Sequence, residues 1–162
     1  MSHPTRGVVV CALLAVGLLT ACGSGAVAID SPAPDAGDRA ACERVIAALP
    51  DRLAGEEGRA VTPDDALGAA WGDPPIVLTC GVDLPAEFDE FATCVEANGV
   101  DWFVPAEQVE DDSRDVTFST AGYRPIVELR VPAEYRPEGG AAALAELAKP
   151  LRKRLELVQP CR

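Results

Sequence analysis

Four cysteines are the residues whose type and spacing carry the clearest chemistry in this chain: Cys42, Cys80, Cys94 and Cys161. An even number of cysteines favours disulfide bonds in an oxidising compartment. Zinc binding is the alternative, because thiolates are zinc ligands. The spacing contains no C-x-x-C pair, and the single histidine, His3, lies close to the N-terminus. We therefore predict two disulfides, with no metal site and no cofactor.

The N-terminal stretch predicts the compartment that the chain enters. Arg6 is followed by an apolar run from Gly7 to Leu19, and then by Thr20-Ala21-Cys22. A basic start, an apolar core and small residues before a cleavage site are typical of a secretory signal peptide. A cysteine directly after Leu-Thr-Ala resembles a bacterial lipobox, in which the cysteine is lipidated and becomes the first mature residue. We predict a signal peptide over 1–21 and a lipid anchor on Cys22.

Two alternatives to the lipobox are an ordinary signal peptide and a transmembrane helix with an incidental cysteine. The apolar run is short for a membrane span, which needs about 20 apolar residues. We therefore expect the protein on the extracytoplasmic face of the cell membrane, held there by its lipid.

Several catalytic chemistries are excluded once the signal peptide and His3 are removed. No Ser-His or Cys-His nucleophilic arrangement can be built without a histidine. The chain has no G-x-S-x-G elbow, no P-loop and no dinucleotide-binding G-x-G-x-x-G motif. Its 26 acidic residues still leave a carboxylate-based glycosidase open. Residues 111–115 hold three aspartates but lack the EF-hand spacing, so we interpret them as a solvated loop. We predict no catalytic residues.

Composition indicates one acidic globular domain. The chain is 48% hydrophobic, and its formal net charge is −12. An acidic domain is repelled by phosphate backbones, which argues against nucleic acid as a partner. Membrane attachment should then depend on the lipid itself. Residues 22–37 are small, polar and proline-bearing, so we predict a flexible tether there and a single domain over 38–162.

Two helices are predicted in the first half of that domain. The first begins at Asp38 and ends at Pro50, with Cys42 on its apolar face. A linking segment rich in glycine and charge follows it. Thr62-Pro63-Asp64-Asp65 then has the pattern of a helix start, which predicts a short helix to Ala70.

The strands are predicted from turn residues and from alternating apolar positions. Trp71 to Pro75 forms a turn into a strand over 76–80, and Asn98-Gly99 forms a tight hairpin between Val95 and Phe103. Strands over 116–120 and 126–131 follow an acidic loop. A C-terminal helix begins near Gly140, and its helical spacing passes through Pro150 to Val158 with an expected kink.

These elements predict an α+β fold: a mostly antiparallel sheet with the N- and C-terminal helices packed on one face. Cys42 on its helix and Cys80 on its strand then both face the core. This placement favours a Cys42–Cys80 disulfide and leaves Cys94 to pair with Cys161. The competing pair is Cys80 with Cys94, whose loop is shorter.

Four residues are candidates for a binding surface: Trp71, Asp73, Tyr123 and Arg124. Each also has a structural interpretation. The tryptophan can belong to the core, Asp73 can cap its turn, and Arg124 can pair with a carboxylate.

The motifs around these residues resemble a known family. They are Ala70-Trp71-Gly72-Asp73-Pro74-Pro75 running on to Cys80-Gly81, together with Asn98-Gly99-Val100-Asp101-Trp102 and Gly122-Tyr123-Arg124-Pro125. They are similar to actinobacterial lipoproteins grouped as domain of unknown function 3515. Thr79 stands where the family commonly has arginine. The resemblance implies a small envelope domain with no assigned activity, and it also favours the Cys42–Cys80 bond.

The sequence therefore predicts a lipid-anchored, non-catalytic binding or accessory module of the actinobacterial envelope, with an envelope protein or cell-wall material as partner. One alternative is a carboxylate enzyme acting on cell-wall glycans, which requires two acids in a cleft. Another is a carrier of a small ligand, which requires a sizeable apolar pocket.

Overall fold

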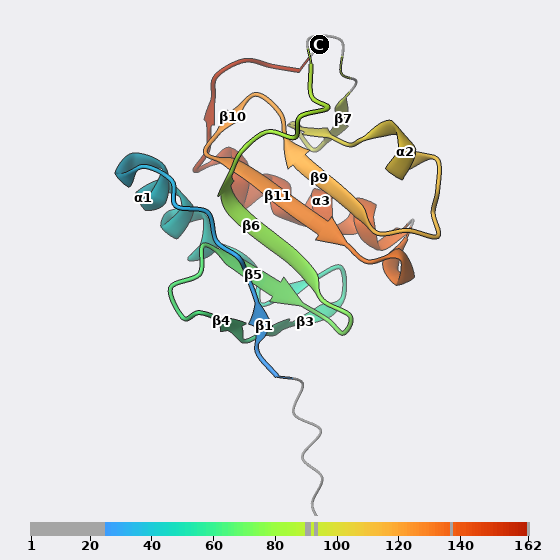
Figure 1. Ribbon diagram of the computed structural model, residues 1–162, viewed down its shortest axis with the longest axis horizontal. Coiled ribbons are helices and arrows are strands. Elements are labelled where there is room, and N and C mark those ends of the chain that lie inside the picture. The colour runs from blue at the N-terminus through green and yellow to red at the C-terminus, as the bar shows by residue number, and fades with distance from the viewer. Residues whose placement is uncertain (1–24, 90–91, 93, 137, 162) are drawn as a thin grey trace, which may run out of the picture.

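An eight-stranded sheet forms the centre of the computed structural model, which describes residues 25–89, 92, 94–136 and 138–161 (Figure 1). Its strand order is β2-β3-β5-β6-β11-β9-β8-β7, and all neighbouring strands are antiparallel. The strands are β2 (Arg52–Leu53), β3 (Glu56–Arg59), β5 (Gly68–Trp71), β6 (Ile76–Val82), β7 (Cys94–Ala97), β8 (Val100–Phe103), β9 (Val116–Thr120) and β11 (Ile126–Val131).

Smaller elements surround this sheet. A parallel pair joins β1 (Val27–Ala28) to β4 (Val61–Thr62), and an antiparallel pair joins β10 (Tyr123–Arg124) to β12 (Glu156–Leu157). The helices in the described residues are α1 (Ala36–Ile46), α2 (Ala106–Val109), the 3₁₀ turn η1 (Ala133–Tyr135) and α3 (Glu138–Arg152). The fold is therefore a mixture of helix and strand dominated by an antiparallel sheet, as predicted.

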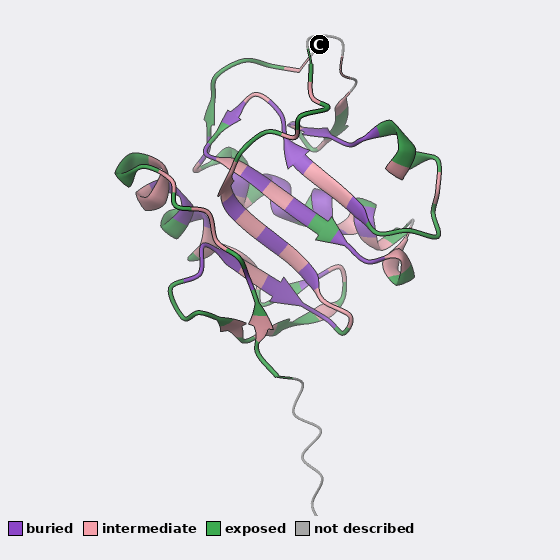
Figure 2. Cartoon of the chain, viewed as in Figure 1, coloured by how far each residue is buried: buried purple, intermediate pink, exposed green. Residues whose placement is uncertain are grey.

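The core lies where alternate residues of the central strands point inward. Leu78 of β6 pairs in register with Leu129 of β11, which pairs with Phe118 of β9. Figure 2 shows the resulting alternation of buried and less buried positions along β6 and β11. Strands 116–120 and 126–131 have the predicted bounds, and the Asn98-Gly99 hairpin is confirmed between β7 and β8.

The start of the domain differs from the prediction. The N-cap of helix α1 is Asp35, three residues before the predicted Asp38, because the carboxylate of Asp35 accepts bonds from the backbone N–H groups of Gly37 and Asp38, at 2.8 and 3.0 Å. The helix ends at Ile46 rather than at Pro50. Cys42 does face the core, as predicted.

Part of the predicted tether is docked on the domain. Strand β1 pairs with β4, and Ile29 is buried, with only 4% of its surface exposed. The hydroxyl of Ser31 accepts a bond from the backbone N–H of Leu67 at 2.7 Å. One apolar and one polar side chain therefore hold this part of the predicted tether against the residues at the start of β5.

The predicted helix after Thr62 is wrong. The chain turns there, and residues 68–71 form β5, which pairs with β6. Pro63, Asp64 and Asp65 serve a turn as well as a helix start, and the tertiary pairing decides between them. The segment predicted as a charged link contains β2 and β3.

The C-terminal helix is shorter than predicted. Helix α3 passes through Pro150 and ends at Arg152, and the chain then turns into β12. Proline removes one helical hydrogen bond, a loss that is tolerated near a helix end. Leu155 is buried, whereas Val158 is 61% exposed, so the apolar periodicity beyond Arg152 does not mark a helical face.

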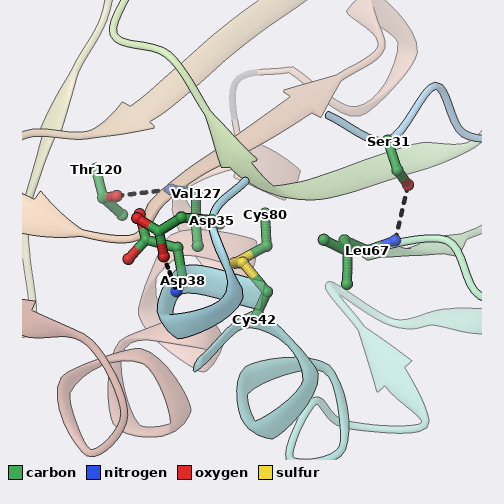
Figure 3. The surroundings of a disulfide bond; sticks show 8 residues. All are labelled: Ser31, Asp35, Asp38, Cys42, Leu67, Cys80, Thr120 and Val127. Atoms are coloured by element: carbon green, nitrogen blue, oxygen red, sulfur yellow. Dashed lines mark hydrogen bonds between the residues drawn. A yellow bond between two sulfur atoms is a disulfide. The ribbon is translucent and has the colours of Figure 1, made fainter. Parts of the chain in front are cut away.

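The structure contains the disulfides Cys42–Cys80 and Cys94–Cys161, with Cα–Cα distances of 5.5 and 6.2 Å. The first links α1 to the centre of the sheet (Figure 3). The second attaches the C-terminal segment to β7. Cys80 therefore does not pair with Cys94.

Candidate functional site

Trp71, one of the four predicted surface residues, belongs to the core. Its side chain is 2% exposed, and the indole Nε1 donates to the carbonyl of Pro50 at 3.0 Å. From the sequence, an aromatic side chain next to a Gly-Asp-Pro-Pro turn is a candidate for an exposed binding residue. Trp71 is instead the last residue of β5, and its side chain points into the core. Trp71 is therefore corrected from a surface residue to a core residue.

Asp73 is exposed and lies beside a cation. Its carboxylate is 3.7 Å from Arg59, whose guanidinium also donates to the carbonyl of Gly72 at 2.7 Å. The Asp73 side chain is 76% exposed, whereas that of Arg59 is 15% exposed. The contact orders the turn between β5 and β6, and with one partner in solvent it contributes at most about 1 kcal/mol.

Tyr123 and Arg124 lie at the other end of the sheet. The turn holding Asp73 precedes β6 and therefore lies near Val77, which pairs with Arg130 at the end of β11. Strand β10, with Tyr123 and Arg124, precedes β11 and therefore lies near Ile126, which pairs with Val82 at the other end of β6. A seven-residue strand spans about 20 Å, so the structure does not bring the four candidates together.

A surface cavity of about 350 Å³ opens beside Tyr123 and Arg124. Its wall is mostly apolar, and Arg124 is the one charged residue among the described residues that line it. Leu84, Phe88, Ile126 and Val158 contribute apolar surface, and residues 159–161 close one side. Sequence reasoning found Tyr123 and Arg124 but missed Leu84, Phe88 and residues 158–161, because these come from segments distant in the chain.

Tyr123 is fixed in the wall of this cavity. Its ring is 7% exposed, and its hydroxyl donates to the carbonyl of Gly99 at 3.0 Å. Burial raises the pKa of the phenol, and the negative charge of Asp101 raises it further. The side chain is therefore a neutral, rigid surface at neutral pH.

The C-terminal wall is held at both ends. The backbone N–H groups of Val158 and Gln159 donate to the carbonyl of Gly122 at 2.8 and 3.1 Å. Gly122 has a φ of 75°, and a Cβ there would collide with the carbonyl oxygen of Gln159. Cys161 is bonded to Cys94, and its N–H donates to Asp101 at 3.3 Å.

Arg124 is exposed on β10, which pairs with β12. In the described residues it forms no ion pair, so the predicted carboxylate partner is not found at contact distance. Its charge does act on Asp35. Backbone N–H donors from Asp38 and Gly37 lower the pKa of that carboxyl, and the charge of Arg124 lowers it slightly more.

A second groove, of about 570 Å³, lies on the other side of the segment around Phe88. Phe88 meets Phe103 edge to face, with centroids 5.3 Å apart. Phe103 and Val95 contribute apolar surface to this groove, and three exposed acids also line it: Glu87, Glu107 and Glu110.

The aspartate-rich loop at residues 111–115 is organised by an arginine. Arg136 donates to the carbonyls of Asp111 and Arg114, both at 2.9 Å, and lies 3.0 Å from the carboxylate of Asp112. In the described parts of the chain no group of three or more potential metal ligands is assembled. No helix there is long and apolar enough to cross a bilayer.

Cys22 and the predicted signal peptide lie outside the described residues. No curated protein and no solved structure matches the chain. A family model does match, over residues 5–160, and it carries the description "Protein of unknown function (DUF3515)". The motifs that pointed to this family lie within the matched range. The chain therefore belongs to the DUF3515 family.

Proposed function

We propose that this protein is a lipid-anchored, extracytoplasmic binding module of the actinobacterial cell envelope. The anchor is Cys22, and the ligand-binding element is the cavity beside Tyr123 and Arg124. The lipobox pattern supports the proposed location, and the cavity supports the proposed ligand binding.

The cavity is the observation that carries the binding function. Its volume of about 350 Å³ falls within the range of about 300–1,000 Å³ found for small-molecule sites. An apolar wall with one cation at its edge suits a ligand with an apolar body and a single anionic group. The disulfide at Cys161 holds one wall in place, which limits the ordering cost of binding.

A carboxylate-based glycosidase is less well supported. Such an enzyme needs two acids across a cleft whose environments separate their pKa values. The acids that line the second groove, Glu87, Glu107 and Glu110, are all exposed. The pKa of Glu128 is raised by burial, but this residue lines neither of the two cavities described above.

The predicted helix arrangement is part of the proposal. Leu78 and Cys80 are two residues apart on β6, so their side chains project from the same face of the sheet. Leu78 is in register with Leu129 of β11, which is in register with Phe118 of β9. Side chains in register project from the same face. Cys42 of α1 is bonded to Cys80, and Gly140 of α3 lies against Phe118. We infer that α1 and α3 cover one face of the sheet.

That inference leaves Thr79 and Thr117 on the face opposite the helices. Thr79→Cys and Thr117→Cys should react with a thiol reagent in the folded protein, whereas Leu78→Cys should not. Equal protection at all three positions would contradict the arrangement.

The anchor is tested by Cys22→Ala, with Cys11→Ala as the matched control inside the apolar run. We expect Cys22→Ala to abolish fatty-acid labelling and to release the protein from the membrane fraction or leave an uncleaved precursor. Cys11→Ala should label like the wild type. Normal labelling of Cys22→Ala would refute the lipobox.

The cavity is tested with an anionic apolar dye, 1-anilinonaphthalene-8-sulfonate. We expect saturable binding that Arg124→Gln weakens by removing the cation, and that Val158→Glu abolishes by placing an acid in the wall. Arg114→Gln, an exposed cation in the acidic loop, is the control and should bind normally. Unchanged binding in both cavity variants would refute the site.

A further inference from the structure

The lysines of this chain are unusually placed. The whole sequence contains two, Lys149 and Lys153, and both line one surface hollow of about 280 Å³ together with Arg152. Lys149 and Arg152, three residues apart, lie on one face of the last turn of α3. Lys153 follows in the turn after the helix, and all three cations line the same hollow. The formal net charge of the chain is −12, so this cluster contrasts with the rest of the molecule.

The other wall of the hollow is the β7–β8 turn, which is anchored to α3. Arg152 Nη1 donates to the carbonyl of Asn98 at 2.9 Å, and Asn98 Nδ2 donates to the carbonyl of Ala145 at 3.3 Å. The guanidinium lies 3.2–3.4 Å from the position of a Cβ on Gly99. Tyr123 fixes the same turn by its bond to Gly99. Arg152 is therefore held in position before any ligand arrives.

Neighbouring acids that the structure describes do not bind these cations directly. In the described residues none of the three forms an ion pair. The two nearby glutamates bond elsewhere: Glu96 accepts from the backbone N–H of Gly99, and Glu146 accepts from that of Ala54 at 3.2 Å. The helix end carries only about half a negative charge. Three full positive charges outnumber these two carboxylates and the half charge of the helix end, so the hollow keeps a net positive charge and attracts anions.

We propose that this hollow is a phosphate-binding site, in which Lys149, Arg152 and Lys153 hold a phosphomonoester or phosphodiester group. Arginine supplies paired N–H donors that match phosphate oxygens, and lysines supply mobile point charges. The hollow shares no lining residue with the cavity beside Arg124, so the two sites can be tested independently.

The two lysines provide the test. Reductive ¹³C-methylation of the full chain, purified in neutral detergent, retains the lysine charges and gives one NMR signal from each lysine. Lys149→Arg and Lys153→Arg assign them. We expect both signals to shift with sn-glycerol 3-phosphate at constant ionic strength and to saturate with one Kd.

Variants show whether the hollow itself is responsible. Arg152→Gln should raise the Kd about tenfold or more, since it removes a charged donor. Lys153→Gln, read at Lys149, should also weaken binding while leaving the Arg152 bond to Asn98 in place. The matched control is Arg44→Gln, which removes a cation from the last turn of α1 and should leave the Kd unchanged. Shifts that do not saturate, or equal effects of Arg152→Gln and Arg44→Gln, would overturn the proposal.

A second arm identifies the source of the phosphate. The methylated chain is placed in nanodiscs of phosphatidylcholine or of phosphatidylglycerol. Shifts with glycerol phosphate support a soluble or wall-borne ligand, and shifts in phosphatidylglycerol discs alone support a lipid headgroup. Absence of both responses would overturn the site.

Discussion

At the scale of single residues, two adjacent hydroxyls on β9 have opposite roles. Thr120 Oγ1 accepts a bond from the backbone N–H of Val127 at 2.9 Å, where the register of β11 with β6 shifts. Ser119 Oγ is buried and has no hydrogen-bond partner among the described residues. One hydroxyl therefore satisfies the backbone, and the other contributes no bond.

Removing these hydroxyls should have unequal effects. Thr120→Val keeps the shape but leaves the buried N–H of Val127 unpaired, so we expect a loss of about 1–3 kcal/mol in the free energy of unfolding. Thr120→Ser should retain most of the stability. Ser119→Ala should change it by no more than about 0.5 kcal/mol. Urea unfolding measures all three, and equal losses for Thr120→Val and Ser119→Ala would contradict this assignment.

Glu128 gives the fold a pH dependence. Burial raises the pKa of its carboxyl above the ordinary value for glutamate, and the positive charge of Arg130 offsets part of that rise. The folded state then holds this proton more tightly than the unfolded state, so stability falls as pH rises from about 4.5 through the folded pKa. Glu128→Gln removes this loss.

We therefore expect Glu128→Gln to raise the midpoint of thermal unfolding at neutral pH and to have little effect near about pH 3, where the carboxyl is neutral in both states. Glu43→Gln, on the exposed side of α1, is the control and should show no such trend. A stabilisation that is independent of pH would refute the titration of Glu128.

At the scale of elements, the two disulfides differ in what they join. Cys42–Cys80 links two fully buried positions over 38 residues, and Cys94–Cys161 attaches a terminal segment over 67. Loop entropy alone assigns about 4 kcal/mol to each. A freed C-terminal segment can gain motion in the folded state, however, whereas the core cannot.

Removing Cys42 and Cys80 together, both to alanine, should therefore cost at least about 4 kcal/mol. The Cys94→Ala/Cys161→Ala pair should cost less and should expose residues 158–161 to proteolysis while the sheet stays folded. Chemical denaturation and limited proteolysis distinguish the two outcomes. A larger loss for the second pair would show that the C-terminal wall is integral to the core.

Sequence patterns predicted the elements whose signals are local. The alternation in residues 126–131 and the Asn98-Gly99 turn each depend on a few neighbouring residues, and both are found. Helix starts and turns share the same residues, so Thr62 to Asp65 predicted the wrong element. The docking of Ile29 and the meeting of Leu84 with Val158 in one cavity wall depend on contacts between distant segments. The spacing of apolar residues along the sequence does not encode such contacts.

At the scale of the whole molecule, β1 and the C-terminal residues lie at opposite ends of the fold (Figure 1). A lipid on Cys22 would tether the β1 end to the membrane and direct the C-terminal wall of the cavity away from it. An epitope tag after Arg162 should therefore be reachable by antibody on intact spheroplasts. Cys22→Ala should lose the cell-associated signal, and a masked tag on the wild type would contradict this orientation.

The confinement of both lysines to one hollow also determines how partners can be found in living cells. Amine-reactive crosslinkers attach to lysine amino groups, so lysine crosslinks on the folded domain capture only neighbours that approach the C-terminal end of α3 and the turn after it. A partner bound elsewhere would give no crosslink and would be missed. The chain has 26 acidic residues, so carboxyl-directed reagents sample far more of its surface. A comparison of the two crosslink maps would show which face of the protein meets its partner.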